Sequence, residues 1–253
     1  MSTVVSELNR HAEHEWQLRV DLAAAFRLAA KFDWHESVAN HFSAAVSTDG
    51  KAFLLNPRWR HFQTIRASDL LLLHADDADA MESADAPDPS AWCIHGNIHA
   101  ALPGARVLLH CHPTYATALA GLADPTLLPI DQNTARFFNR VAYDTGFDGI
   151  ADNATEGVRL ARAFGNHQIM MMGNHGVTVV GTSVAEAFDT LYYFERAAKT
   201  MVLAYSTGQP LNVMSDALAE KTAAGWGEYG GMGDAHFAFL KTQLDQEDAN
   251  YAS

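Results

Sequence analysis

Two histidines separated by one residue, His110 and His112, have the spacing that could bind a metal ion. They lie in the apolar run 107–112, which stops at Pro113 and is typical of a short strand. Side chains of a strand alternate between its faces, so both imidazoles project from one face, about 7 Å apart at Cα, while Cys111 faces the opposite side. Two imidazole nitrogens so placed can bind one cation at about 2.0–2.1 Å each. Packing of two histidines in a strand explains the pair equally well, so the motif alone leaves both interpretations open.

A third histidine, His175, stands between Asn174 and Gly176, where two short apolar runs at 168–173 and 177–181 meet. Glycine at such a turn allows the backbone or a ligand to approach closely. Taken alone, a histidine in a turn is better explained as exposed to water. Its assignment as a third ligand therefore needs further support.

Segments with helical and strand patterns alternate along the chain, and together they would position these histidines around one core. Residues 6–32 carry a broad apolar stripe without glycine or proline, which predicts a helix. Residues 40–46 alternate in type and end at a Ser-Thr-Asp-Gly turn, which predicts a strand. The same reasoning predicts strands at 52–55, 107–112, 168–173 and 177–181, and helices at 91–101, 114–121, 183–205 and 235–244. We therefore expect one α/β layered domain over residues 1–253.

Composition excludes several classes of protein. The formal charge is −13, from 17 basic and 30 acidic residues, and no basic face for nucleic acid is visible. The apolar runs are too short to span a bilayer, and residues 1–10 lack the pattern of a secretory signal. Two cysteines, Cys93 and Cys111, cannot build a disulfide framework. We therefore expect a cytoplasmic protein that acts on a small molecule, with no nucleic-acid or membrane partner.

Two longer segments carry a resemblance to a known family. The run Leu-His-Cys-His-Pro-Thr-Tyr-Ala-Thr-Ala-Leu at 109–119 and the run Gly-Asn-His-Gly-Val-Thr-Val-Val-Gly-Thr-Ser at 173–183 resemble the class II aldolase/adducin family. The segment Val-Ala-Asn-His-Phe-Ser at 38–43 is similar to an early polar segment of its adducin-like branch. The likeness extends over most of the chain, from the first predicted helix to about residue 205.

The resemblance implies an α/β/α sandwich, with three layers around a mainly antiparallel central sheet. It implies a homotetramer, in which we expect residues 210–253 to form a C-terminal tail at the subunit interface. It also implies a zinc or manganese ion on His110, His112 and His175, the matching positions of the family's His-x-His and Asn-His-Gly motifs. Adducin itself lacks this triad, so its retention favours an enzyme over a non-catalytic, adducin-like interaction protein.

Two departures from the family pattern bear on the reaction. Sugar-phosphate aldolases of the family carry a proton-shuttling glutamate in the run Ser-Ser-Glu-Trp, whereas this chain has Ala91 there, in Pro-Ser-Ala-Trp. They also bind phosphate with a glycine-containing loop, and the matching run here, Ser-Val-Ala-Asn at 37–40, has no glycine. A carboxylated or unphosphorylated substrate is therefore favoured over a sugar phosphate.

A metal-dependent carbon–carbon lyase fits this sequence best. A bound cation can accept electron density as a bond to carbon breaks. Decarboxylation needs this electron sink but no base to remove a proton from carbon, so a decarboxylase of a small hydroxylated or carbonyl-bearing carboxylate is our first prediction. The alternative is an aldolase, epimerase or dehydratase that acts on a sugar-like substrate, with another group in place of the glutamate.

Candidates for that group are Tyr143, in an alternating run, His95 and His99. His95 and His99 lie four residues apart on one face of a predicted helix, a spacing that fits a metal site or, better, a buried hydrogen-bonded pair that supports the site. For substrate binding, the resemblance indicates Asn40 and Ser43 in the early polar segment and Ser90, which remains from the paired serines. Arg58 is a candidate because a guanidinium can bind a carboxylate through two hydrogen bonds, although a surface charge explains it as well.

Overall fold

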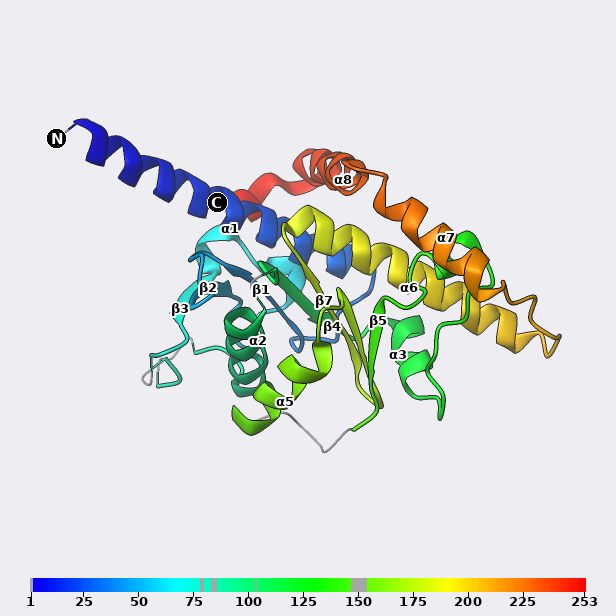
Figure 1. Ribbon diagram of the computed structural model, residues 1–253. Helices are drawn as coiled ribbons and strands as arrows, with labels where there is room; N and C mark the ends of the chain where they lie inside the picture. Colours follow the sequence, from blue (N-terminus) through cyan, green and yellow to red (C-terminus); the bar gives the residue numbers. More distant parts are fainter. Residues whose placement is uncertain (1, 78–79, 83–85, 103, 147–153) are drawn as a thin grey trace.

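A computed structural model describes residues 2–77, 80–82, 86–102, 104–146 and 154–253. Its centre is a seven-stranded sheet with the strand order β3-β2-β1-β4-β7-β6-β5 (Figure 1). The pairing of β5 with β6 is parallel and the other neighbours pair antiparallel. In the order across the sheet, the strands are β3 (Leu71–His74), β2 (Ala52–Leu55), β1 (His41–Ala45), β4 (Val107–Cys111), β7 (Gly176–Gly181), β6 (Ile169–Met172) and β5 (Val141–Asp144).

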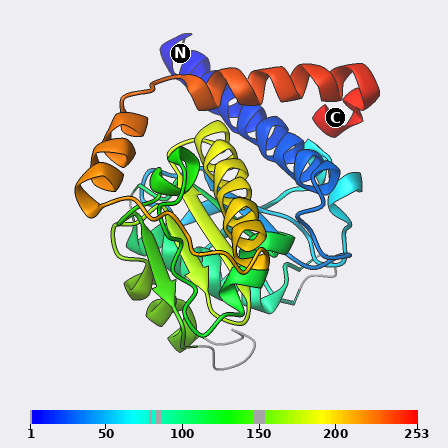
Figure 2. The same ribbon diagram turned by 90° about the vertical axis from the view of Figure 1, so that its right-hand side faces the viewer.

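Helices cover both faces of the sheet (Figure 1). On one face lie α1 (Ser2–Lys31), α3 (Thr114–Ala120) and α6 (Val184–Ser206), and α8 (Met232–Asp248) packs on α1 and α6 (Figure 2). On the other face, α2 (Pro89–Ala101) packs against α5 (Ala154–Phe164). The remaining elements are α4 (Gln132–Ala135), α7 (Asp216–Gly227) and the short 3-10 helices Phe62–Thr64, Ala67–Asp69 and Ala249–Ala252. The predicted three-layer α/β/α sandwich is therefore confirmed.

The sheet is buried on both faces, and the alternation of side chains divides its residues between two cores. Phe42, Leu109 and Cys111 belong to the large cluster under α1 and α6, where Phe42 stacks on Phe26 with ring centroids 4.8 Å apart. Leu108 belongs to the cluster under α2 and α5. At the centre of this second face, the buried residues of β1 include His41 and Ser43. The middle of the sheet under α2 is therefore polar, and its polar groups need partners.

The strands and helices predicted around the histidines are present with small shifts of their ends. The predicted helix at 91–101 begins earlier, because the Asp88 side chain accepts the N–H of Ser90 and Pro89 occupies the first turn. The helix predicted at 235–244 extends over Met232–Asp248. Strands β3 and β5 and helices α5 and α7 were not predicted as elements. Among the described residues, no helix is long and apolar enough to cross a membrane.

Candidate metal centre

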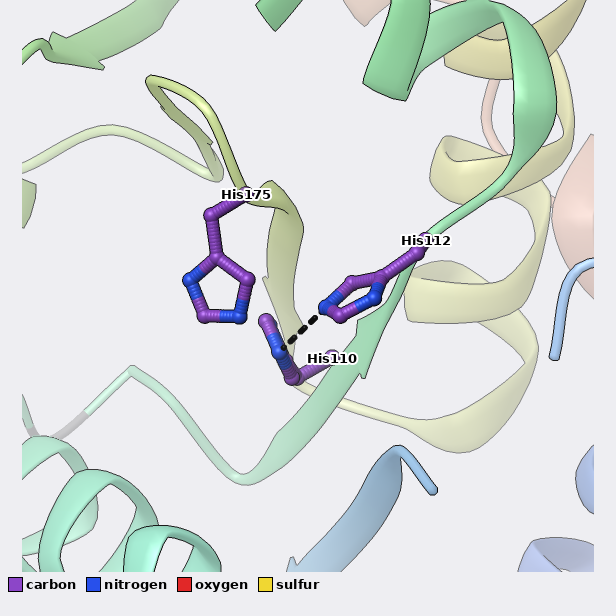
Figure 3. Close-up of side chains that lie close together, drawn as sticks. All are labelled: His110, His112 and His175. Atoms are coloured by element: carbon purple, nitrogen blue, oxygen red, sulfur yellow. Dashed lines mark hydrogen bonds between the residues drawn. The ribbon is translucent and has the colours of Figure 1, made fainter. Parts of the chain in front are cut away.

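The three histidines of the sequence motifs converge at one end of the central strands (Figure 3). His110 lies in β4 and His112 directly follows it, whereas His175 lies in the turn between β6 and β7. Since β7 pairs antiparallel with β4 and Val177 lies opposite Cys111, the start of β7 meets the end of β4. The three ring centroids are 4.7–5.1 Å apart, and one nitrogen from each ring lies within 4.8 Å of the other two. The predicted convergence of the three side chains is present.

The turn that carries His175 depends on its neighbours. Asn174 has a φ of +54°, a left-handed conformation that asparagine tolerates, and its N–H donates to the carbonyl of Ala120 at 2.9 Å. A Cβ on Gly176 would overlap the His112 ring and lie 2.8 Å from the carbonyl oxygen of Cys111. Glycine at this position therefore lets the two strands bring their histidines together.

Hydrogen bonds at Nδ1 leave Nε2 of His110 and of His112 as the nitrogens available to a metal. In the tautomer that can bind a metal through Nε2, Nδ1–H of His110 donates to the Thr178 hydroxyl at 3.0 Å, and that hydroxyl donates to the sulfur of Met172 at 3.3 Å. The carboxylate of Glu36 accepts Nδ1–H of His112 at 2.6 Å. In both neutral rings, Nε2 is then unprotonated. Such partners orient metal-binding histidines and increase their basicity.

The two unprotonated Nε2 atoms of His110 and His112 face each other at 3.2 Å (Figure 3). In this tautomer the two lone pairs repel at that distance unless a cation lies between them. Burial lowers the pKa of His110 well below its ordinary value and that of His175 to about 4, which favours the neutral form of both rings. Two nitrogens bound to one tetrahedral zinc at 2.0–2.1 Å are about 3.3–3.4 Å apart. The donor set therefore fits a divalent metal ion held by three neutral imidazoles.

A cavity of about 420 Å³ opens at the three histidines, a volume that suits a small molecule. Its wall consists of Val38, Ala39, Asn40, His41, Asn56, Arg58, Trp59, Asp88, Ser90, Ile94, His110, His112, Asn174 and His175. Trp59 stands at the rim with 67% of its surface exposed and a φ of +63°, which is unusual for a bulky residue. A planar apolar side chain is therefore available at the mouth of the cavity.

Three of the four predicted substrate-binding residues, Asn40, Arg58 and Ser90, line this cavity. Asn40 has a φ of +72°, and its side-chain oxygen accepts the N–H of Glu36 at 3.0 Å, which fixes the segment that supports His112. The Ser90 hydroxyl donates to Asp88 at 2.6 Å. Each of the three therefore has a polar group at or near the cavity wall.

The other predicted residues lie elsewhere. Ser43 and His95 are fully buried behind the cavity, where they hydrogen-bond each other. Tyr143 lies in β5, three strands away from β4, and its hydroxyl accepts the N–H of Leu127 at 2.9 Å. It lines a different cavity, so within this chain it does not meet the three histidines.

Sequence reasoning missed His41, Glu36 and Trp59. A signal for His41 was present, since His41 and Ser43 alternate in a strand exactly as His110 and His112 do. The sequence does not reveal that β1 pairs with β4, and it is this pairing that places His41 opposite His110. Ala91, at the position of the aldolase glutamate, is 1% exposed and packs in an apolar cluster with Phe53.

Comparisons with known proteins agree with this geometry. The profile described as "Class II Aldolase and Adducin N-terminal domain" matches residues 20–202. The "Putative aldolase class 2 protein" of Caulobacter vibrioides is 31% identical over 247 residues, 95% of this chain and 94% of that protein. "Decarboxylase NovR" of Streptomyces niveus is 26% identical over 207 residues, 81% of this chain and 76% of that protein. The crystal structure of an aldolase II superfamily protein from Pseudomonas syringae superposes with a TM-score of 0.86 at 32% identity, covering 94% of this chain and 96% of that one.

Proposed function

This chain belongs to the class II aldolase and adducin family, and from that premise we propose that it is a metal-dependent carbon–carbon lyase. The observation that carries the proposal is the set of three imidazole nitrogens that converge beside a cavity. Three protein ligands leave a fourth position for water or substrate, the arrangement typical of catalytic metal sites. We propose zinc or manganese as the ion and a homotetramer as the assembly.

We propose decarboxylation of a small hydroxylated or carbonyl-bearing carboxylate as the reaction. When bound, the cation would polarise the substrate oxygen and accept electron density as the carbon–carbon bond breaks. Arg58 in the cavity wall would attract the anionic substrate, and Asn40 and Ser90 would orient it through hydrogen bonds. The relative named as a decarboxylase supports this assignment.

A retro-aldol cleavage, or an epimerase or dehydratase reaction on a sugar-like substrate, is the alternative. Such reactions move a proton at the substrate, and Ala91 cannot do so because its methyl group has no exchangeable proton. The observation that favours this alternative is an imidazole of another residue, His41, in the cavity wall. A purely adducin-like interaction protein would have no need of three oriented imidazoles.

The experiment that tests the proposal combines metal analysis with a substrate panel. We expect about one zinc or manganese ion per chain after reconstitution. The variant His112→Ala should lose most of that metal, whereas His74→Ala, which removes an exposed histidine from the edge strand β3, should retain it. Metal-loaded protein is then offered oxo acids, hydroxy acids and hydroxyketones, and the release of carbon dioxide and of aldehyde is measured.

Carbon dioxide release that depends on the metal and is lost in His112→Ala would support a decarboxylase. Aldehyde release with the same dependence would support the aldolase alternative. A metal content that His112→Ala leaves unchanged would exclude the three-histidine site, and with it both reactions.

A further inference from the structure

A continuous chain of hydrogen bonds leads from the cavity wall into the protein interior under α2. His41 Nδ1 lies 2.6 Å from His95 Nε2, and His95 Nδ1 forms a short hydrogen bond with Ser43 Oγ. Ser43 Oγ lies 2.6 Å from His99 Nε2, and His99 Nδ1 lies 2.6 Å from the carbonyl oxygen of Ala105. The side chains of this chain are all buried, with at most 6% of each residue exposed.

The direction of every hydrogen bond follows from the last acceptor. A carbonyl oxygen can only accept, so His99 carries its proton on Nδ1 and its Nε2 accepts the Ser43 hydroxyl. Having donated its one proton, Ser43 accepts from Nδ1–H of His95, whose Nε2 then accepts from Nδ1–H of His41. His41 therefore has an unprotonated Nε2.

This reasoning requires neutral rings, and burial provides them. Removal from water lowers the pKa of His99 to about 4, and it lowers the pKa of His95 well below its ordinary value. A neutral imidazole has one donor and one acceptor, so fixing one nitrogen fixes the other.

The free nitrogen of His41 faces the cavity. The ring forms part of the cavity wall and stacks on His110, with centroids 4.7 Å apart and an interplanar angle of 26°. No hydrogen bond to Nε2 is found among the described residues. The buried side-chain atoms without a partner in that part of the chain are His35 Nδ1, Thr117 Oγ1 and Arg136 Nη1. Since Nε2 of His41 is not one of them, it is open to the cavity.

Two other roles for His41 fit less well. It stands outside the group of three histidines whose nitrogens lie within 4.8 Å of one another, so it is not part of the metal cluster. A path for protons to solvent would need a group that can take up or release a proton at its inner end, and this one ends on the carbonyl oxygen of Ala105. The chain of hydrogen bonds is therefore suited to holding one tautomer.

We propose that His41 is a specificity-determining residue, whose Nε2 is held as a hydrogen-bond acceptor for a hydroxyl group of the substrate. His95, Ser43 and His99 are positioning residues that act through His41. The inference rests on the proposed function and narrows its substrate class to compounds with a hydroxyl group next to the metal-bound function. A site that accepts from a hydroxyl group discriminates against the analogue that lacks it, because the acceptor then loses its partner.

The first test reads the tautomers directly and needs neither metal nor turnover. In protein labelled with ¹⁵N-histidine, two-bond correlation spectra at neutral pH distinguish a protonated from an unprotonated ring nitrogen. We expect Nδ1–H and an unprotonated Nε2 in His41, His95 and His99. The variant Ser43→Ala should leave His41 as a mixture of tautomers, while Ser68→Ala, a substitution of an exposed serine, should not. A proton on Nε2 of wild-type His41 would overturn the proposal.

The second test compares lactate with propionate, which differ by one hydroxyl group, as ligands of the zinc-loaded protein. One neutral hydrogen bond corresponds to a preference of about 2- to 12-fold for lactate. Lactate should also shift the Nε2 resonance of His41, and propionate should not. Because zinc itself can prefer a hydroxy acid, the ratio is measured again in His41→Phe, which retains a ring against His110 but has no acceptor.

We expect the lactate preference to fall by that same factor in His41→Phe. An unchanged ratio would mean that the metal alone recognises the hydroxyl group, which would overturn the proposal. If the wild-type protein does not bind zinc at all, the proposed function is contradicted. The tautomers measured in the metal-free protein would then still show whether Nε2 of His41 is an acceptor. The two failures are therefore distinguishable.

Discussion

Replacement of Glu36 by alanine should weaken metal binding without removing a ligand. Glu36 lies outside the cavity wall, and its side chain contacts the site through one hydrogen bond, from Nδ1–H of His112 to its carboxylate at 2.6 Å. This bond selects the tautomer of His112 that leaves Nε2 free for the metal and makes that nitrogen more basic. In Glu36→Ala the ring can rotate or change tautomer, so the affinity for zinc should fall.

The size of the effect follows from the exposure of the pair. Loss of such an outer partner commonly costs a factor of about 10–100 in metal affinity. The side chain of Glu36 is 56% exposed and that of His112 is 17% exposed, so water can replace the carboxylate in part. We therefore expect a value near the lower limit, about 10-fold, which corresponds to about 1.4 kcal/mol.

Competition with a chromophoric chelator measures this affinity for wild type and variant at the same pH. Glu220→Ala is a matched control, since Glu220 is 49% exposed and pairs with Arg140 at 2.6 Å, away from the three histidines. Equal zinc affinities in Glu36→Ala and wild type would refute the argument that the carboxylate orients His112. A complete loss of metal would indicate that Glu36 binds the metal itself and does not only orient His112.

Three further changes test other parts of the structure. Gly176→Ala should abolish zinc binding and lower the melting temperature, since a Cβ meets the His112 ring, whereas Gly225→Ala, with open space around it, should change neither. Ala91→Glu should lower the free energy of unfolding by about 3 kcal/mol or more, because it buries an unpaired carboxylate. Ala100→Glu, on the exposed side of α2, should leave that free energy nearly unchanged. Equal midpoints of urea unfolding for the two variants would contradict this expectation. Burial raises the pKa of Glu195 to about 6 from 4.5, so its contribution to stability is present in full below pH 4.5 and is lost as the pH rises through 6. Relative to Glu195→Gln, the free energy of unfolding of wild type should therefore fall by about 1.6 kcal/mol between pH 4.5 and 7. Parallel pH profiles of the two proteins would contradict the shift.

Local patterns predicted the elements that carry the three histidines because those patterns are strong. The alternation around His110 and His112 reveals both the strand and the shared face of the two rings. By contrast, β3 lies in a run of leucines at 70–73, which has no alternating period, and the alternating run of β5 was not recognised as a strand. In α5, Gly157 weakens the helical pattern, yet a side chain there would overlap the backbone of α2.

Which site residues meet depends on strand order, and strand order is not local. Tyr143 and His41 both lie in alternating runs, so the sequence alone does not show which of them lies near the three histidines. The sheet places β5 at its edge, three strands from β4, and places β1 beside β4. His41 therefore reaches the metal centre and Tyr143 does not. His175 was identified from the family resemblance because its position depends on the pairing of β4 with β7.

The polar centre of the sheet also determines how the side chains behind the site are oriented. Ser43 and His99 are buried between α2 and the sheet, where each unpaired polar group would cost about 1–3 kcal/mol. Their hydrogen bonds remove that cost only if every donor meets an acceptor, and the carbonyl of Ala105 permits a single arrangement. The alternative arrangement, with a proton on Nε2 of His41, would leave His41 Nδ1 and His95 Nε2 as two acceptors 2.6 Å apart. The buried hydrogen bonds of His95, Ser43 and His99 thus determine which nitrogen of His41 is unprotonated toward the cavity. Ser43 takes part in this although it does not line the cavity.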